Sequence, residues 1–250
     1  MKSILSTLLL ADARKWAEDT PRGEHGRWTA GGGSGSKPKA GKVPKFASVA
    51  EAEKYAKSKL GMKDVNLGKD KAIAQIVMQG IQNTRDAGGK LPKNVEVQTG
   101  KDADHGMGRE WTLITAINKD GSSKLFVNGD HPFIWERGAL AQDARENAHD
   151  HWMSSTNPNH MFNHEAGHLA HAETLGPGKW YTMARTGKVG NLENKWSSRS
   201  EREMVAREVS KYGSSEPMEM VAEVYAGRLA GKSFSSPVMS LYQKFGGKRI

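Results

Sequence analysis

Two histidines and a glutamate stand at a spacing that suits metal chemistry. His164, Glu165 and His168 form the pattern H-E-x-x-H. Positions i and i+4 of a helix lie on the same face, so the two imidazoles can bind one metal ion from one side. The glutamate then lies beside the open coordination position, where it can accept a proton from a metal-bound water. The pattern predicts a zinc site with Glu165 as the general base.

The residues around this motif favour a helix. Ala166, Leu169 and Ala170 supply an apolar flank at helical spacing, and no proline interrupts residues 161–173. Taken alone, the pattern leaves a second interpretation open, which is a polar helix whose histidines face water and bind nothing.

A third protein ligand must come from another part of the chain, because catalytic zinc usually takes three protein ligands and a water. His171 follows His168 by three residues on the same face of the expected helix. It could be a ligand, but an outer or solvated position is the favoured interpretation. Further histidines near the motif (His149, His151 and His160) are interpreted as neutral surface residues.

A second helix with two carboxylates is expected downstream. Glu219 and Glu223 stand at i and i+4, after Pro217 in the first turn and a cap at Ser214 or Ser215. The neighbouring positions form an apolar stripe of Met218, Val221, Ala222, Tyr225 and Leu229. Both carboxylates could point to water. Beside an H-E-x-x-H motif, however, a metal and its histidines are the favoured partners, since an unpaired buried carboxylate is costly.

The two motifs together resemble the gluzincin class of zinc metallopeptidases. They are most similar to the family of the anthrax lethal factor catalytic domain and its phage and toxin relatives. That family carries H-E-x-G-H, then a Tyr, six intervening residues and a Glu inside an E-F-F-A-E-A-F helix. Here the matching positions are residues 164–168, Tyr212 and residues 219–225, with a Met-Val pair at 220–221 in place of the aromatic pair. The resemblance covers about residues 155–230.

This resemblance implies a role for each matching residue. Glu219 would be the third zinc ligand with His164 and His168. Tyr212 would hydrogen-bond the oxyanion, and Glu223 would accept a hydrogen bond from a ligand histidine. From its position after the preceding helix alone, Tyr212 could equally be a packed core tyrosine.

The rest of the chain favours an α+β fold. Helices are expected at 48–60, 70–87, 199–211 and 237–245, and strands at 95–97, 111–117 and 124–127, the last two as a hairpin. The fold class is therefore a zincin-like metallopeptidase domain with a small antiparallel sheet, an active-site helix and a helical C-terminal part. Residues 136–160 are polar, and residues 179–198 are expected to form a loop whose Trp180, Tyr181 and Trp196 could cover the cleft.

Substrate recognition in zincin-type peptidases uses the edge of the sheet. The strand beside the metal pairs with the substrate backbone, which is recognition by strand addition. By analogy with that fold, we expect the edge strand at Lys124–Asn128 or at Phe133–Trp135.

The N-terminal part differs in composition from the rest. Residues 1–45 carry nine Lys/Arg against four Asp/Glu, a net charge of +5 out of the total of +9, and they contain a Gly/Ser run at 31–36. We expect a basic flexible arm and linker over 1–45 and one metallopeptidase domain over 46–250. A basic arm can hold nucleic acid, but a solvated tail is the commoner case, so nucleic-acid binding is not expected.

Two short segments of the arm bear on origin and location. Residues 21–32 resemble a P-R-G-x-x-G-R-W-T segment of tailed-phage structural and head-morphogenesis polypeptides. The apolar run at 4–10 is too short to span a membrane and favours a short amphipathic helix over a secretory signal. These features predict a phage-encoded protein in the bacterial cytoplasm or associated with the virion, with no transmembrane segment.

Composition limits the chemistry further. The chain of 250 residues has no cysteine, which excludes disulfides and thiolate metal ligands. The predicted function is therefore a zinc-dependent endopeptidase, a hydrolase acting on a protein or peptide, with phage structural proteins as candidate partners. The alternatives are a non-enzymatic phage structural protein with an incidental motif, a phage-immunity peptidase acting on a repressor, and a toxin-like effector protease.

Overall fold

The computed structural model describes residues 41–103, 111–135 and 138–249. In this part of the chain the fold is α+β, with helices, one four-stranded sheet and one two-stranded sheet. The elements in chain order are α2 (Val49–Leu60), β1 (Asp64–Asn66), α3 (Lys71–Asp86), β2 (Asn94–Gln98), the 3₁₀ helix η1 (Gly100–Ala103), β3 (Leu113–Ile117), β4 (Ser123–Asn128), α4 (Pro132–Trp135), α5 (Ala139–His149), α6 (His160–Leu175), α7 (Pro177–Thr186), β5 (Lys188–Val189), β6 (Leu192–Glu193), α8 (Arg199–Glu208), α9 (Pro217–Leu229) and α10 (Ser236–Lys244).

The larger sheet is mixed, so the expectation of an antiparallel sheet is wrong in part. Its strand order is β1-β2-β4-β3, with β1, β2 and β4 parallel and β3 antiparallel to β4. The expected β3–β4 hairpin is present, because the turn between the two strands is short. The strands β1 and β2 are parallel because α3 connects them, and a helical crossover returns the chain in its original direction.

The edge strand beside the centre of the molecule is β3, not either of the predicted segments. β4 lies inside the sheet between β2 and β3, and Phe133 belongs to the short helix α4. The two strands of a hairpin have similar local sequences, so their order in the sheet depends on which one pairs with a third strand. The parallel pairing of β2 with β4 leaves β3 at the edge.

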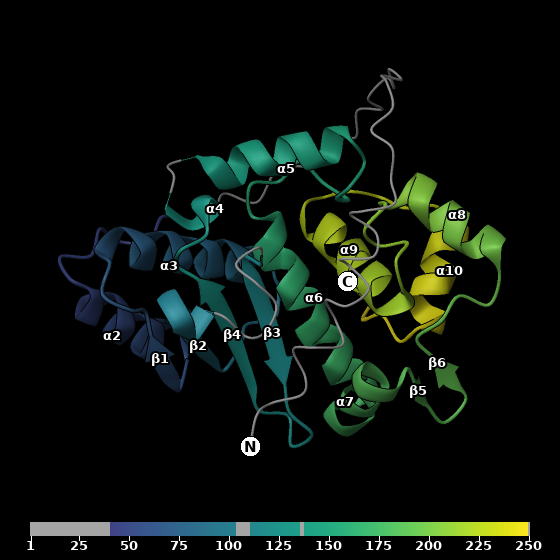
Figure 1. Cartoon of the computed structure of the whole chain (residues 1–250), viewed down its shortest axis with the longest axis horizontal. Coiled ribbons are helices and arrows are strands. Elements are labelled where there is room, and N and C mark those ends of the chain that lie inside the picture. Colours follow the sequence, from purple (N-terminus) through teal and green to yellow (C-terminus); the bar gives the residue numbers. More distant parts are fainter. Residues whose placement is uncertain (1–40, 104–110, 136–137, 250) are drawn as a thin grey trace.

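Helix α6 is the central element and carries the H-E-x-x-H motif (Figure 1). It packs against β3 on one side and against α9 on the other. Gly167 allows the close approach of α9, since a Cβ at this position would lie 2.7 Å from the Ala222 Cα atom and 2.9 Å from its carbonyl oxygen. The sequence thus places the two motif-bearing helices in direct backbone contact.

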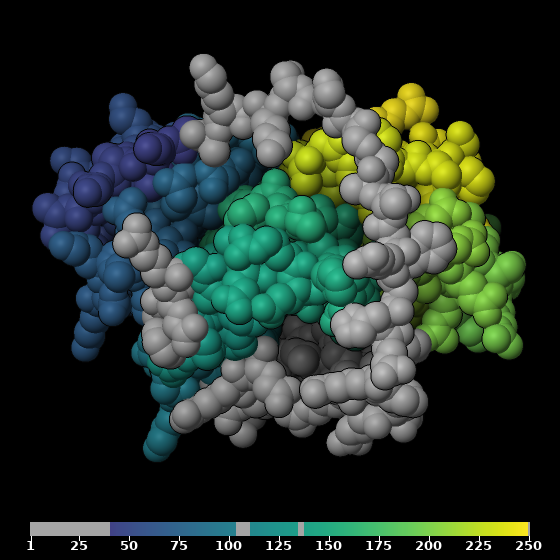
Figure 2. Space-filling model, turned by 90° about the horizontal axis from the view of Figure 1, so that it is seen from above, coloured from purple at the N-terminus to yellow at the C-terminus, as the bar shows by residue number. Residues whose placement is uncertain are grey.

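Two hydrophobic groups flank this central pair. Helices α2 and α3 pack on the sheet around residues such as Ile81, Val95 and Leu125. Helices α8, α9 and α10 enclose a second core that includes Val221 and Tyr242. Figure 2 shows the molecule from above, with α5 and the residues that follow it between the N-terminal and the C-terminal elements.

Several local expectations are confirmed, and others are wrong. Helix α2 begins after the Ser48 cap as expected, and α10 lies within one residue of its predicted bounds. Helix α5 was not predicted within the polar stretch, and α7 occupies the first half of the expected 179–198 loop. Pro177 ends the region of the motif helix and is also the first residue of α7. Proline is tolerated there because the backbone N–H of the first helical residue makes no hydrogen bond within the helix.

The expected cap of α9 is also wrong. Glu216 stands at its N-cap position, and the hydroxyls of Ser214 and Ser215 instead donate to the carbonyl oxygens of Lys211 and Tyr212, both at 2.7 Å. The two serines thus stabilise the turn that carries Tyr212.

Most of the expected N-terminal arm, including the phage-like segment and the apolar run, lies outside the described residues. Its last residues and the first residue of the domain pack on α3, where Val43 and Phe46 are buried and their amides donate to Gln79 and Gln75. Among the helices that the structure describes, none is long and apolar enough to cross a membrane.

Candidate metal centre

Helix α6 presents three histidines on one face. His160, His164 and His168 are spaced by four residues, so they lie one turn apart along the side that faces α9. His160 and His164 are buried and His168 is half-buried. The ring centroids of His164 and His168 are 4.8 Å apart. The predicted pair is therefore brought together as the helical spacing requires.

Helix α9 brings Glu219 to the same place. Its Oε2 atom lies 3.0 Å from His164 Nε2 and 3.6 Å from His168 Nε2, and the two Nε2 atoms are 3.2 Å apart. These three residues form a compact group whose ligand atoms all lie within 4.8 Å of one another. The two imidazoles and the carboxylate expected from the sequence are thus adjacent in the structure.

The protons around these atoms indicate that a cation belongs between them. His164 Nδ1 lies 2.9 Å from Glu223 Oε1, and a carboxylate oxygen is an acceptor. This contact meets hydrogen-bond geometry, whereas Nε2 lies 3.0 Å from Glu219 Oε2 without forming a hydrogen bond. The ring proton of neutral His164 is therefore assigned to Nδ1, which leaves the lone pair of Nε2 facing Glu219 Oε2. That oxygen is buried and has no hydrogen-bond partner among the described residues. These two acceptor atoms lie 3.0 Å apart and repel one another unless a cation lies between them.

The charges of the site support the same interpretation. Burial alone would raise the pKa of Glu219, but the charge of His168 and the close approach of the His164 ring lower it well below the usual value. Burial also opposes ionisation of Glu223, yet the charge and hydrogen bond of His160 and the bond from His164 bring its pKa well below the usual range. Two buried carboxylates carry a charge of −2, which a divalent cation balances.

The pKa of His164 reports the same attraction for positive charge. Burial would lower this pKa, but the adjacent carboxylates of Glu219 and Glu223 raise it well above 6.5. Two imidazole nitrogens and one carboxylate oxygen are a donor set that Zn²⁺ takes in catalytic sites. The residues present therefore fit the predicted metal.

Tyr212 lies against this group. Its ring centroid is 5.5 Å from that of His164, and its amide donates to the Trp152 carbonyl oxygen at 3.2 Å. Burial and the charges of Glu219, Glu165 and Glu223 raise the pKa of the phenol well above 10. Tyr212 is therefore a protonated hydrogen-bond donor at neutral pH. Tyr212 is packed, but the residue that it packs against, His164, is a candidate metal ligand. A role in core packing alone therefore does not describe this tyrosine.

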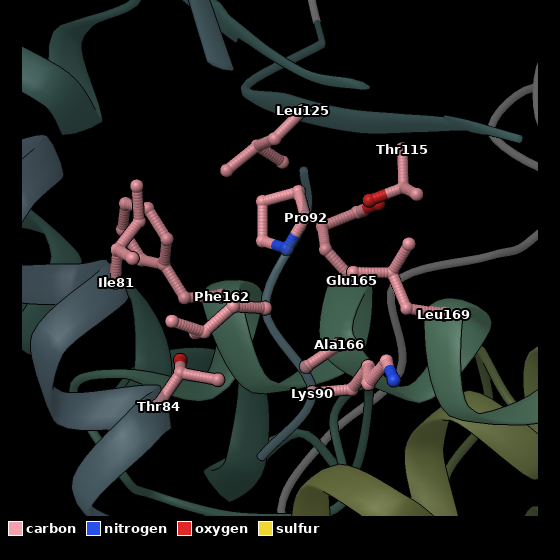
Figure 3. Close-up of a pocket in the computed structure, with 11 residues that line it drawn as sticks. Ile81, Thr84, Lys90, Pro92, Thr115, Leu125, Phe162, Glu165, Ala166 and Leu169 are labelled. Atoms are coloured by element: carbon pink, nitrogen blue, oxygen red, sulfur yellow. The ribbon is translucent and has the colours of Figure 1, made fainter. Parts of the chain in front are cut away.

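Glu165 lies on the flank of α6 that faces the sheet. Its side chain points toward Thr115 of the edge strand β3 and lines a pocket between α3, α6 and the sheet (Figure 3). Leu125 and Phe162 contribute apolar walls to this pocket. Glu165 is not part of the group of ligand atoms. It is half-buried, and its charge reaches Tyr212.

The other histidines considered from the sequence have different surroundings in the structure. His171 is buried and its Nε2 lies 2.8 Å from the Phe245 carbonyl oxygen, so this ring is directed toward α10 and not toward the ligand group. Burial lowers the pKa of His171 to about 3, and a solvated position is excluded. His149 is exposed, as expected.

His160 is the residue that sequence reasoning missed. It was interpreted as a surface histidine, yet its side chain is only 1% exposed and its Nε2 lies 2.8 Å from Glu223 Oε1. The available signal was its position four residues before His164, which places it on the same helix face.

The tryptophans of the expected loop have different surroundings. Trp180 is buried in α7, with its ring centroid 6.2 Å from that of His168. Trp196 packs on Phe245 and donates to the Ser214 carbonyl oxygen at 2.9 Å. Trp180 thus borders the ligand group as a wall of the core, and Trp196 stabilises the turn before α9.

Comparison with protein-family models, with curated proteins and with solved structures finds no match to this chain.

Proposed function

We propose that this protein is a zinc-dependent endopeptidase that hydrolyses a protein or peptide substrate. The proposal rests on the close approach of three potential ligand atoms, His164 Nε2, His168 Nε2 and Glu219 Oε2, which lie within 3.6 Å of one another in a buried site. Bound zinc would polarise a substrate carbonyl and lower the pKa of a water. The gluzincin resemblance of the two motifs supports the same assignment.

Each of the chain's own residues has a defined task in this proposal. Glu165 accepts the proton of the attacking water at its carboxylate and passes it to the leaving amine. Tyr212 donates its phenolic proton in a hydrogen bond to the oxygen on which negative charge develops. Glu223 holds the His164 ring through the Nδ1–H bond, which keeps the Nε2 lone pair directed at the site.

The edge strand β3 supplies a place for the substrate backbone. In its pairing with β4, the Thr112 carbonyl oxygen accepts from the Asn128 amide, and the register places Thr115 opposite Leu125. Antiparallel pairing alternates, so the main-chain groups of Leu113, Thr115 and Ile117 point to the outer edge of the sheet. We propose that an extended substrate pairs with these groups by strand addition.

The proposed partners and location follow from the sequence. The substrate is a protein or peptide, and phage proteins are candidates because residues 21–32 resemble a phage segment. We place the protein in the bacterial cytoplasm or on the virion.

The first test is the metal content of the purified protein. We expect about one zinc per chain in the wild type and its loss in His168→Ala and in Glu219→Ala, because each variant removes a ligand atom. His171→Ala is the matched control, since this buried histidine on the same helix bonds Phe245 and should leave zinc in place. Absence of zinc from the wild type, even after reconstitution, would make a non-enzymatic phage structural role the leading interpretation.

The second test addresses the reaction. Glu165→Gln should keep zinc and lose turnover on a peptide library, because the amide cannot accept the proton of the attacking water. Full activity of this variant would contradict the proposed mechanism. Cleavage of many sequences would support a general endopeptidase, whereas cleavage of one DNA-binding repressor would support the phage-immunity alternative.

A further inference from the structure

We propose that His160 is a positioning residue of the metal centre, which holds the Glu223 carboxylate so that Glu223 fixes the tautomer and orientation of His164. The inference rests on the proposed function, because it takes His164 to be a zinc ligand. It assigns a role to a residue that neither motif includes.

The Glu223 carboxylate is enclosed by donors. Its Oε1 atom lies 2.8 Å from His160 Nε2 and 2.9 Å from His164 Nδ1, and its Oε2 atom accepts from the Ser154 amide at 2.6 Å. The carboxylate is 1% exposed. An oxygen with two lone pairs is fully used by two N–H donors. The two histidines therefore share one oxygen, and together they prevent the carboxylate from rotating.

The orientation of His160 is itself fixed from the other side. Because Nε2 faces a carboxylate, it carries the ring proton, and Nδ1 then accepts a hydrogen bond from the Ser155 hydroxyl at 2.9 Å. The resulting chain of hydrogen bonds runs from Ser155 through His160 to Glu223, where it meets the bond from His164. Every member of the chain has one consistent proton arrangement with both rings neutral.

This arrangement has a direct consequence for the metal centre. With its proton committed to Glu223, His164 can present only the Nε2 lone pair to Glu219 and His168. Loss of the donor at His160 would leave one lone pair of Glu223 Oε1 unused in a buried site, and the carboxylate could turn toward another donor. Outer partners of metal-bound histidines typically change metal affinity by about 10- to 100-fold.

A second metal site in the same place is a poorer interpretation. His160, His164 and Glu223 also bring three ligand atoms within 4.8 Å of one another. In this group, however, His160 Nε2 and His164 Nδ1 both form hydrogen bonds with Glu223 Oε1, so a proton already occupies each contact. In the group with Glu219, by contrast, the buried oxygen has no hydrogen-bond partner.

The test compares two variants of His160 with a control on the same helix. His160→Leu removes the donor, whereas His160→Gln keeps an N–H that can reach Glu223. His171→Leu removes an equally buried histidine that contacts Phe245 instead. The measurements are the zinc dissociation constant by chelator competition, the absorption spectrum of the Co²⁺-substituted protein, and the melting temperature.

We expect His160→Leu to weaken zinc binding about 10- to 100-fold and to change the Co²⁺ spectrum. His160→Gln should recover most of the affinity. His171→Leu should lower the melting temperature and leave the zinc dissociation constant unchanged. Wild-type zinc affinity and Co²⁺ spectrum in His160→Leu would overturn the inference, and so would an equal loss of affinity in His171→Leu or in His160→Gln.

Nitrogen NMR of the histidine rings separates this inference from the proposed function. In metal-free protein at alkaline pH, His164 should carry its proton on Nδ1 in the wild type and should lose that preference in His160→Leu. A wild type that binds no zinc but shows this difference would contradict the endopeptidase and retain the role of His160. The same tautomer of His164 in both proteins would overturn the role of His160, whatever the metal content.

Discussion

Gly167 of α6 lies against Ala222 of α9 with no room for a side chain between the two helices. A Cβ at Gly167 would lie 2.7 Å from the Ala222 Cα atom, a distance that real Cβ atoms do not adopt. This contact sets the separation between the helix that carries His164 and His168 and the helix that carries Glu219. The glycine inside the H-E-x-G-H motif therefore controls the geometry of the ligand group.

We predict that Gly167→Ala destabilises the protein and weakens zinc binding. The added methyl group must push α9 away, and overpacking of a core costs about 1–3 kcal/mol. Gly178→Ala is the matched control, because Gly178 is helical and an added Cβ would meet only ordinary contacts at 3.7 Å. It should be neutral or stabilising by up to about 1 kcal/mol. Urea denaturation and zinc titration of both variants check the prediction, which equal stabilities of the two would contradict.

Tyr212→Phe should lower kcat and leave zinc content unchanged. The phenol is a protonated donor beside His164, and loss of one oxyanion donor typically costs about 100- to 1,000-fold in kcat. The ring and its packing remain, so the melting temperature should change little. Tyr55→Phe on α2, which removes a hydroxyl bonded to Gln82, is the control and should keep full activity. A Tyr212→Phe enzyme with wild-type kcat would exclude this tyrosine from the reaction.

The proposed pairing of a substrate with β3 predicts an alternating effect of amide methylation. A substrate strand bonds β3 through every second residue, because successive amides of an extended chain point to opposite sides. Peptides methylated at the amides that face β3 should bind more weakly than peptides methylated at the intervening amides. Inhibition constants of such a peptide series provide the measurement. Equal inhibition by all members of the series would exclude strand addition at this edge.

The buried carboxyl of Asp143 predicts a pH dependence of stability. Burial raises its pKa to about 6, its Oδ1 accepts from the Asn147 amide, and its Oδ2 has no partner among the described residues. A raised carboxyl pKa means that the folded state holds the proton more tightly than the unfolded state. Stability from this group is therefore greatest below about pH 4, and it falls as the pH rises to about 6.

Asp143→Asn should remove this pH dependence and stabilise the protein at pH 8. The shift from 3.8 to about 6 corresponds to roughly 3 kcal/mol at most, since each unit is about 1.4 kcal/mol. Asp150→Asn, at the exposed end of the same helix, is the control and should follow the wild-type profile. Parallel stability curves for Asp143→Asn and the wild type between pH 4 and pH 8 would contradict this assignment.

The sequence by itself determined the local parts of the candidate site. A four-residue spacing on a helix places His164 and His168 on one face, and the same spacing places Glu219 and Glu223 together on α9. Helix periodicity is a local property, so these pairs could be predicted without knowledge of the fold. The hairpin of β3 and β4 followed equally from alternating residues and a short turn.

Only the tertiary structure decided what these pairs face. It placed Glu219 beside the Nε2 atoms of the two imidazoles and Glu223 beside the Nδ1 atom of His164. It also buried His160 against the Glu223 carboxylate. It also turned His171 toward α10 and left β3 at the sheet edge. The spacing of residues along one helix fixes which side chains share a face. The residue opposite that face depends on contacts between distant segments, and these form only when the chain packs.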